Sequence, residues 1–232
     1  MLRLDNVYAG YGKSQVLQGV NLEVKRGEAV ALLGRNGVGK TTTLRTIMGL
    51  NSSNQGSIIF DGKRVDMLPG HKVTRLGVGY VPQGRHIFPN LSVLDNLCIG
   101  LTRAPKEEQL ERIFNRFPRL QERLKQQGGT LSGGEQQMLA IARCLIVKPR
   151  ILLLDEPTEG IMPKLVASLR DEIRAINESG VSILFVEQNI PAALAVCSRV
   201  YIMEKGAICH ETSTEDLRAN PDVIHRYLGV SI

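Results

Sequence analysis

The chain has 232 residues and a formal charge of +6, with basic and acidic residues interleaved along its length. This composition is that of an ordinary globular protein and excludes extended disorder and fibrous repeats, while the interleaved charges favour a soluble surface over a patch for polyphosphate or anionic lipid. No apolar run approaches the about 20 residues of a membrane-spanning helix, and the start of the chain has no signal-peptide pattern, so we expect a chain that does not cross a membrane itself.

The first part of the chain is typical of β-strands. Short apolar or alternating runs predict strands at residues 2–8, 20–24, 29–33, 58–60 and 78–81. Asp61-Gly62 directly follows the fourth run and signals a turn, and Pro82 ends the fifth.

Residues 92–147 have a different pattern. Pro118 must begin, kink or divide a helix, and Gly128-Gly129 separates the first half of this segment from a helix that begins near Ser132. We therefore expect a mostly helical insert. Its apolar residues recur at helical spacing, with charges between them, at Leu110, Ile113, Phe114, Phe117, Leu120 and Leu124.

After Pro149 the pattern alternates between strands and helices. Strands are expected at 151–154, 181–186 and 200–203, and helices at 164–177 and 192–198. Such alternation predicts an α/β fold with a parallel sheet and right-handed crossovers.

A phosphate-binding motif lies between the strand at 29–33 and a helix-like run from Thr42. Glycines let successive backbone N–H groups point at phosphate oxygens, and the helix N-terminus adds its positive dipole. The motif predicts that the chain binds a nucleoside triphosphate, with Lys40 on the β- and γ-phosphates and the Thr41 hydroxyl on Mg²⁺. The alternative is a glycine-rich turn that binds nothing. The motif, hereafter the phosphate loop, comprises Gly34, Arg35, Asn36, Gly37, Val38, Gly39, Lys40 and Thr41.

Two carboxylates follow the apolar run at 151–154. A central parallel strand would deliver Asp155 and Glu156, hereafter the acidic pair, to the carboxyl edge of the sheet, where ligands bind in such folds. Asp155 is then a candidate Mg²⁺ ligand, and Glu156 can accept a proton from an attacking water. Alone, either acid could equally be a solvated strand end.

Residues 131–135 read Leu-Ser-Gly-Gly-Glu and precede a helix. Ser132 and Glu135 have the spacing of a capping box, which needs no ligand. Gly133 and Gly134 weaken a helix start by about 1 kcal/mol each relative to Ala, and we interpret them as room for a phosphate to approach the backbone.

These three motifs, in this order, resemble those of the ATP-binding subunits of ABC transporters, and the resemblance covers nearly the whole chain. It implies a single ABC ATPase domain, with a RecA-like P-loop NTPase core and an N-terminal antiparallel β subdomain at 1–88 and 149–232. The helical subdomain, inserted at 89–148, would carry the signature motif at 131–135. The implied cofactors are ATP and Mg²⁺.

The resemblance also implies roles for single residues. Tyr11 would stack on adenine, and Gln83 would contact Mg²⁺ and the transmembrane partner. Ser132 to Glu135 would complete the ATP-binding site of a second subunit. Thr42 would lie beside the phosphates of the ATP bound to its own subunit. Gln188 stands where most relatives have a switch histidine, and it can hydrogen-bond a γ-phosphate but cannot carry a proton.

One subfamily of the ABC transporter ATPases also resembles this sequence at residues 82–89, 132–143 and 185–189. It powers importers of branched-chain amino acids, urea and short amides, and residues 34–43 and 156–161 favour its urea-type members. Met162 stands where most relatives outside it carry an aspartate.

The implied partners are a second ATPase subunit, identical or similar, two transmembrane permease subunits and, indirectly, a solute-binding protein, at the cytoplasmic face of the inner membrane. No nucleic acid is expected. The alternatives are a non-transport ABC ATPase that acts on nucleic acid or an assembly complex, and a regulatory module without turnover. Long coiled coils or a second cassette would favour the former, and neither is present in this sequence.

Overall fold

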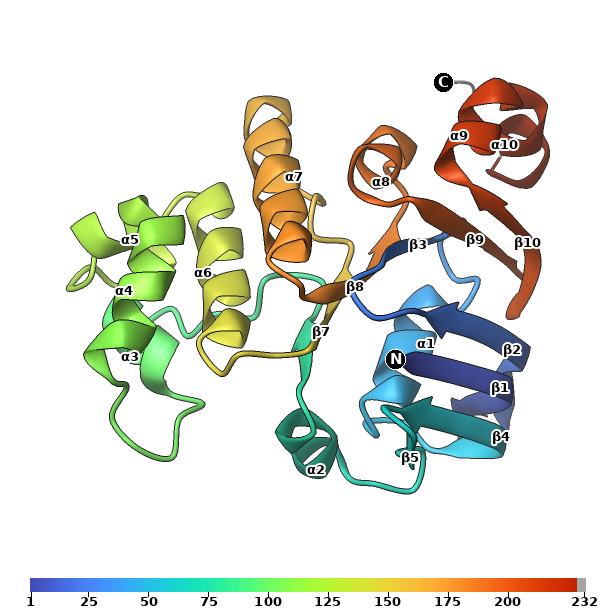
Figure 1. The fold of residues 1–232 in the computed structure, drawn as a ribbon, viewed down its shortest axis with the longest axis horizontal. Coiled ribbons are helices and arrows are strands. Elements are labelled where there is room, and N and C mark those ends of the chain that lie inside the picture. The colour runs from blue at the N-terminus through green and yellow to red at the C-terminus, as the bar shows by residue number, and fades with distance from the viewer. Residues whose placement is uncertain (229–232) are drawn as a thin grey trace.

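The computed structural model describes residues 1–228, which form two sheets with helices around them (Figure 1). A four-stranded antiparallel sheet has the order β2–β1–β4–β5, and a six-stranded sheet has the order β10–β9–β3–β8–β7–β6. The first contains β1 (Leu2–Tyr11), β2 (Ser14–Val24), β4 (Ser53–Phe60) and β5 (Lys63–Arg64). The second contains β3 (Ala29–Leu33), β6 (Val78–Val81), β7 (Ile151–Asp155), β8 (Ser182–Glu187), β9 (Arg199–Glu204) and β10 (Ala207–Ser213).

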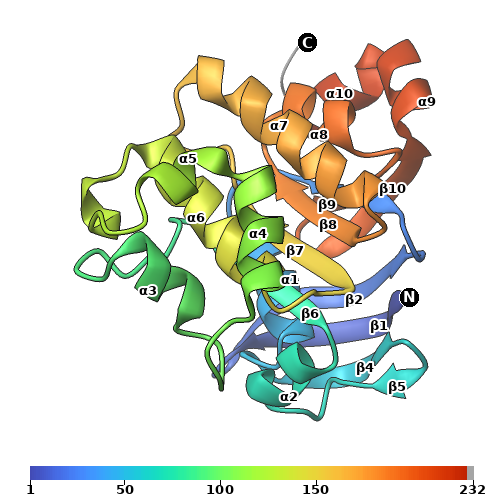
Figure 2. The same ribbon diagram turned by 60° about the vertical axis from the view of Figure 1, so that its left-hand side comes forward.

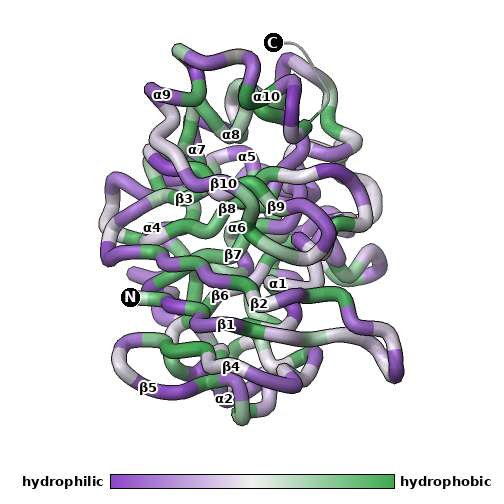
Figure 3. The backbone as a smooth tube through the Cα atoms, turned by 90° about the vertical axis from the view of Figure 1, so that its right-hand side faces the viewer, coloured by the Kyte–Doolittle hydropathy of each residue, from purple (hydrophilic) through white to green (hydrophobic). Residues whose placement is uncertain are grey.

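Strand β3 contributes side chains to two hydrophobic cores, one on each face of the six-stranded sheet. Ala31 and Leu33 face one core, and Val30 and Leu32 face the other, because side chains alternate along a strand. All five residues of β3 are buried, as expected for a central parallel strand covered on both faces. Figure 3 shows the hydrophobic segments passing through β3, β7 and β8.

The core between the two sheets contains α1 (Lys40–Ile47), whose Leu44 and Ile47 pack with residues of β1, β2 and β4. The short helix α2 (Gly70–Arg75) leads into β6. The opposite face of the six-stranded sheet packs against α7 (Pro163–Glu178), α8 (Ile190–Val196), α9 (Thr214–Ala219) and α10 (Pro221–Leu228) (Figure 2).

A group of helices extends from one end of the six-stranded sheet (Figure 1). Pro118 begins α5, since proline fits the first turn of a helix. The insert shares one hydrophobic core with the six-stranded sheet. Its contribution includes Ile113, Phe117 and Leu120, together with residues of α6. The group contains α3 (Val93–Cys98), α4 (Glu107–Arg116), α5 (Pro118–Glu122), a 3₁₀ turn (Gly128–Thr130) and α6 (Gly133–Leu145).

The α/β fold class is confirmed, and every strand and helix expected from the sequence is present, with ends that differ by up to six residues, most at the start of β2. The expected parallel sheet is correct except at β10, which runs antiparallel to β9 at the edge. Helices α2, α9 and α10 and strand β10 were not expected. Among the described residues, no helix combines the length and the apolarity that crossing a bilayer requires.

Candidate functional site

The phosphate loop connects the carboxyl end of β3 to the first turn of α1. Gly37 and Gly39 have φ angles of 78° and 114°, which suit glycine, and the loop needs them to turn back toward the helix. A Cβ on Gly34 would lie 2.6 Å from the Met203 carbonyl oxygen, so that position is closed to other residues. The first turn of α1 has no acidic residue, and its N–H groups can therefore attract an anion.

Lys40 is the first residue of α1, and only 4% of its surface is exposed. Its Nζ donates to the carbonyl oxygens of Gly34 at 2.9 Å and Arg35 at 3.1 Å. The same ammonium lies 3.1 Å from Glu156 Oε1. The phosphate loop and the acidic pair, far apart in the sequence, thus meet through a buried ion pair.

Asp155 ends β7 beside the phosphate loop and is 1% exposed. Its two carboxylate oxygens accept hydrogen bonds from Thr41 Oγ1 at 3.0 Å and from the Tyr80 hydroxyl at 3.1 Å. Burial raises the pKa of the Asp155 carboxyl above its ordinary value, although both hydroxyls lower it. Burial and Asp155 also raise the pKa of the Tyr80 hydroxyl, which keeps it a donor. A threonine hydroxyl beside a carboxylate is a pair of hard oxygen donors that suits Mg²⁺.

Glu156 adopts a φ angle of 45°, an unfavourable conformation for a residue with a Cβ, and is 7% exposed. Its Oε2 accepts a hydrogen bond from Gln188 Nε2 at 2.7 Å and a longer one from Gln83 Nε2 at 3.4 Å. Gln83 Nε2 also donates to Glu159 Oε2 at 2.7 Å. Two carboxamides and one ammonium therefore fix the position of the Glu156 carboxylate.

Lys40, Thr41, Glu156 and the two glutamines that contact Glu156 border a single cleft of about 340 Å³. The cleft lies at the carboxyl edge of the parallel strands, as expected for a ligand site in an α/β sheet. Its lining is polar and contains donors for phosphate together with carboxylates. The lining residues are Val16, Asn36, Gly37, Gly39, Lys40, Thr41, Thr42, Gln83, Glu156, Glu159 and Gln188.

Four of the nucleotide contacts expected within the chain lie outside this lining, as does the expected metal ligand Asp155. The four are Tyr11, Gly34, Arg35 and Val38. Tyr11 is in the β1–β2 hairpin and is 46% exposed; Val16, on the next strand, borders the cleft instead. Arg35 contributes its carbonyl to Lys40, while its side chain donates from Nε to the Leu228 carbonyl oxygen at 3.3 Å.

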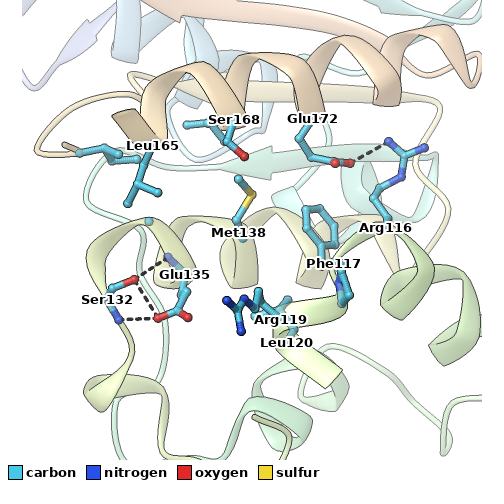
Figure 4. Close-up of a pocket in the computed structure, with 14 residues that line it drawn as sticks. Arg116, Phe117, Arg119, Leu120, Ser132, Glu135, Met138, Leu165, Ser168 and Glu172 are labelled. Atoms are coloured by element: carbon cyan, nitrogen blue, oxygen red, sulfur yellow. Dashed lines mark hydrogen bonds and ion pairs between the residues drawn. The ribbon is translucent and has the colours of Figure 1, made fainter. Parts of the chain in front are cut away.

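The residues Ser132 to Glu135 do not reach this cleft in their own chain. Ser132, Gly134 and Glu135 line a different pocket, between α5, α6 and α7 (Figure 4). Ser132 Oγ accepts from the Glu135 N–H at 3.4 Å, and the Ser132 N–H donates to Glu135 Oε2 at 2.9 Å, so the capping box is formed.

The two glycines of this segment lie close to side chains of their own chain. A Cβ on Gly134 would lie 2.7 Å from Leu165 Cδ1, and one on Gly133 would lie 3.0 Å from both terminal nitrogens of Arg85. Both neighbours are the ends of flexible side chains, so these contacts do not by themselves require glycine, and the interpretation of the two glycines as room for a phosphate stays a prediction.

Sequence reasoning missed Tyr80, Glu159 and Glu187. Glu187, 2% exposed, accepts hydrogen bonds from Thr158 Oγ1 at 2.7 Å, the Thr158 N–H at 3.0 Å, and the N–H groups of Gln188 and Asn189 at 3.1 Å each. Burial raises the pKa of the Glu187 carboxyl. Glu187 ends β8 beside β7, so knowledge of the strand order was required to find it.

Comparison with known proteins gives consistent matches. The pattern of the ABC transporter family matches residues 17–159. The chain is 42% identical to the high-affinity branched-chain amino acid transport ATP-binding protein BraG of Pseudomonas aeruginosa, over 99% of this chain and 100% of that protein. It is 37% identical to the probable branched-chain amino acid transport ATP-binding protein LivF of Archaeoglobus fulgidus, over 94% of each. It is also 37% identical to the lipopolysaccharide export system ATP-binding protein LptB of Escherichia coli, over 98% of this chain and 97% of that protein.

Solved structures agree on the fold. A nucleotide-free ATP-binding cassette from an ABC transporter superposes with a TM-score of 0.86 at 23% identity, over 100% of this chain and 99% of that one. A dimeric post-hydrolysis state of the ATP-binding cassette MJ0796, bound to ADP and Pi, superposes with a TM-score of 0.81 at 27% identity, over 92% of this chain and 99% of that one.

Proposed function

This chain belongs to the ABC transporter family of ATP-hydrolysing subunits, and from that membership we propose that it powers an importer of a small polar solute. The observation that carries the ATPase assignment is that Lys40, Thr41 and Glu156 line one cleft, where Lys40 pairs with Glu156 and Thr41 donates a hydrogen bond to Asp155. Branched-chain amino acids are the solute class we favour, because BraG and LivF are both named for their transport. The urea-type preference rests on residues near the nucleotide, and no reported relative is named for urea.

In the proposed reaction the chain binds ATP through the phosphate loop and the N-terminus of α1. Lys40 and the N–H groups of the loop hold the β- and γ-phosphates. Thr41, Asp155 and Gln83 are the candidate ligands of Mg²⁺, which when bound would neutralise phosphate charge. Tyr11 is the candidate for stacking on adenine, from a hairpin beside the cleft.

Glu156 is the proposed general base. It takes a proton from a water as that water attacks the γ-phosphorus, and the bond from phosphorus to the β–γ bridging oxygen breaks. Gln188 and Gln83 orient the carboxylate by hydrogen bonds. Gln188 has no charge, so Lys40 is the side chain proposed to neutralise the charge of the γ-phosphate.

We further propose that two ATPase subunits act together, with Ser132 to Glu135 of one completing the cleft of the other. In support, Ser132, Gly134 and Glu135 line a pocket away from the cleft of their own chain, and the related cassette MJ0796 is a dimer. Permease subunits and, indirectly, a solute-binding protein would complete the transporter at the cytoplasmic membrane face. The segments 1–88 with 149–232, and 89–148, are the proposed core and helical subdomains.

The test has two parts. The purified chain should release phosphate from ATP in the presence of Mg²⁺, and a Lys40→Ala variant should not. A strain that lacks this chain should lose uptake of labelled leucine and keep uptake of labelled urea. Loss of urea uptake alone would reverse the solute assignment, and absence of phosphate release would overturn the ATPase assignment.

A second candidate is export of a lipid-linked molecule, favoured by the 37% identity to LptB. It predicts a defect of the cell envelope in the same deletion strain, with uptake of both solutes unchanged. No observation on this chain favours the remaining alternative, an ABC ATPase that acts on nucleic acid or an assembly complex.

A further inference from the structure

Arg85 lies where three segments around the candidate site meet. It belongs to the segment 82–89, hereafter the glutamine loop, two residues after Gln83. Its guanidinium donates to the Gly160 carbonyl oxygen at 3.0 Å and to Gln136 Oε1 at 3.3 Å. Gly160 is in the loop that follows the acidic pair, and Gln136 is in the first turns of α6.

Two glycines, Gly133 and Gly160, lie close to the Arg85 guanidinium. A Cβ on Gly133 would approach both terminal nitrogens to 3.0 Å, and one on Gly160 would approach a terminal nitrogen to 3.4 Å. A Cβ at residue 133 would make the guanidinium shift by a few tenths of an ångström and so disturb its contacts with its two acceptors.

The backbone at Arg85 is itself in an unfavourable conformation. Arg85 and His86 have φ angles of 68° and 47°, and consecutive residues with a Cβ rarely adopt this region. Such conformations persist where surrounding contacts hold them, and they gather at functional sites.

A second tether joins the glutamine loop to α6 without involving the loop after the acidic pair. Arg143 donates to the His86 carbonyl oxygen at 2.7 Å, and its guanidinium lies 5.4 Å from the ring centre of Phe88. The glutamine loop is thus held to α6 at two points. Only the Arg85 contact also reaches residue 160.

We propose that Arg85 is a positioning residue for ATP hydrolysis: it fixes α6 and the loop after Glu156 relative to each other. The inference rests on the proposed function, in which the first turn of α6 completes the cleft of a second subunit. Arg85 does not line the cleft of its own chain, so it acts through Gly160 and Gln136 and does not touch phosphate. Loss of its contacts would leave nucleotide binding by one chain intact and misplace the first turn of α6.

The first experiment measures the steady-state ATPase activity of the wild type, Arg85→Ala, Arg85→Lys and Arg143→Ala. We expect Arg85→Ala to lower kcat about 10- to 100-fold with little change in KM, since a small misplacement remote from the chemistry has effects of this size. Arg85→Lys should recover part of the loss, because an ammonium can reach one of the two acceptors. Arg143→Ala, the matched control, should stay within about twofold of the wild type, because its tether does not reach residue 160.

Nucleotide affinity separates positioning from binding. At protein concentrations too low for two subunits to associate, titration of Mg²⁺-ATP should give the same dissociation constant for Glu156→Gln and for Glu156→Gln combined with Arg85→Ala. The proposal is overturned if Arg85→Ala keeps the wild-type kcat, if Arg143→Ala loses as much activity, or if ATP affinity falls with Arg85. In each case the activity of the wild type still tests the proposed function separately.

A double-mutant cycle on stability tests the contact without any reaction. Gly133→Ala should lower the Tm by about 2–4 °C in the wild-type background, because it displaces the guanidinium. In the Arg85→Ala background the same substitution should leave the Tm unchanged or raise it, since Ala favours helix over Gly. Equal shifts in the two backgrounds would overturn the contact.

Discussion

At the scale of single residues, Glu156 contacts three side chains that have a proposed role in ATP hydrolysis. Its carboxylate contacts Lys40, Gln188 and Gln83, and its backbone is held at a positive φ angle. A carboxylate held in this way is suited to orient a water and accept its proton, since positioning is required before a base can act.

We expect Glu156→Gln to slow ATP hydrolysis about 10²- to 10⁴-fold, the range for loss of a positioned base. The carboxamide keeps the shape of the side chain but cannot take a proton, so ATP binding should persist. Single-turnover phosphate release, together with a titration of ATP binding, checks both parts. Unchanged turnover would remove Glu156 from the role of base.

Lys40→Ala should act on binding. We expect it to weaken ATP affinity about 10- to 100-fold, the equivalent of the about 1.5–3 kcal/mol of a charge-assisted hydrogen bond. Calorimetry with Mg²⁺-ATP measures the change, and Glu156→Gln serves as the matched control, because it breaks the same ion pair from the other side. Equal affinities in the two variants would contradict the proposed contact of Lys40 with phosphate.

At the scale of elements, the end of β8 is tied to the segment after β7 through Glu187 and Thr158. The Thr158 hydroxyl donates at 2.7 Å to a carboxylate that is 2% exposed. A donor lost from such a buried carboxylate leaves its charge less well compensated.

Thr158→Val removes this donor at nearly constant shape and should destabilise the fold by about 1–3 kcal/mol. The corresponding fall in Tm is about 2–4 °C for each kcal/mol in a chain of this size. Thr158→Ser keeps the hydroxyl and should stay closer to the wild type. Thermal denaturation of the three proteins decides, and equal Tm values for the Val and Ser variants would count against the hydrogen bond.

The elements also differ in how well the sequence predicts them. Strands β3, β7 and β8 are fully buried, and their continuous apolar runs were sufficient to predict them. Strand β10 is an edge strand without a fully buried residue, and α2 has a single one, so neither carries a clear periodic pattern.

The candidate site divides in a similar way. Lys40, Thr41, Asp155 and Glu156 belong to local motifs whose chemistry depends on spacing, and the sequence was enough to bring them together. Tyr80 reaches Asp155 only because β6 pairs with β7, and Arg85 reaches Gln136 only because the glutamine loop packs on α6. Such contacts depend on tertiary neighbours, which spacing along the chain does not reveal.

At the scale of the whole molecule, the cleft and the residues Ser132 to Glu135 are separate in one chain. The proposed reaction needs both around the same ATP, so we expect association of two subunits to depend on nucleotide. The comparison with the dimeric cassette MJ0796 supports this expectation.

Light scattering on Glu156→Gln should detect dimers with Mg²⁺-ATP and monomers without nucleotide, if this chain pairs with itself. Wild-type protein should return to monomers as ATP is consumed. Where the natural partner is a different subunit, the same change should appear only when both are mixed. Dimers that form equally well without nucleotide would contradict closure on ATP.

In the ligand-free chain, the Glu156 carboxylate is paired with the Lys40 ammonium, the group proposed to bind the γ-phosphate of ATP. In the proposed mode of binding the γ-phosphate replaces this carboxylate at the ammonium, so we expect a lower affinity for ATP than the phosphate loop alone would provide. The displaced carboxylate becomes available beside the same phosphate. We therefore expect ATP binding itself to release Glu156 from the ion pair with Lys40 and to free it for its proposed role as the base.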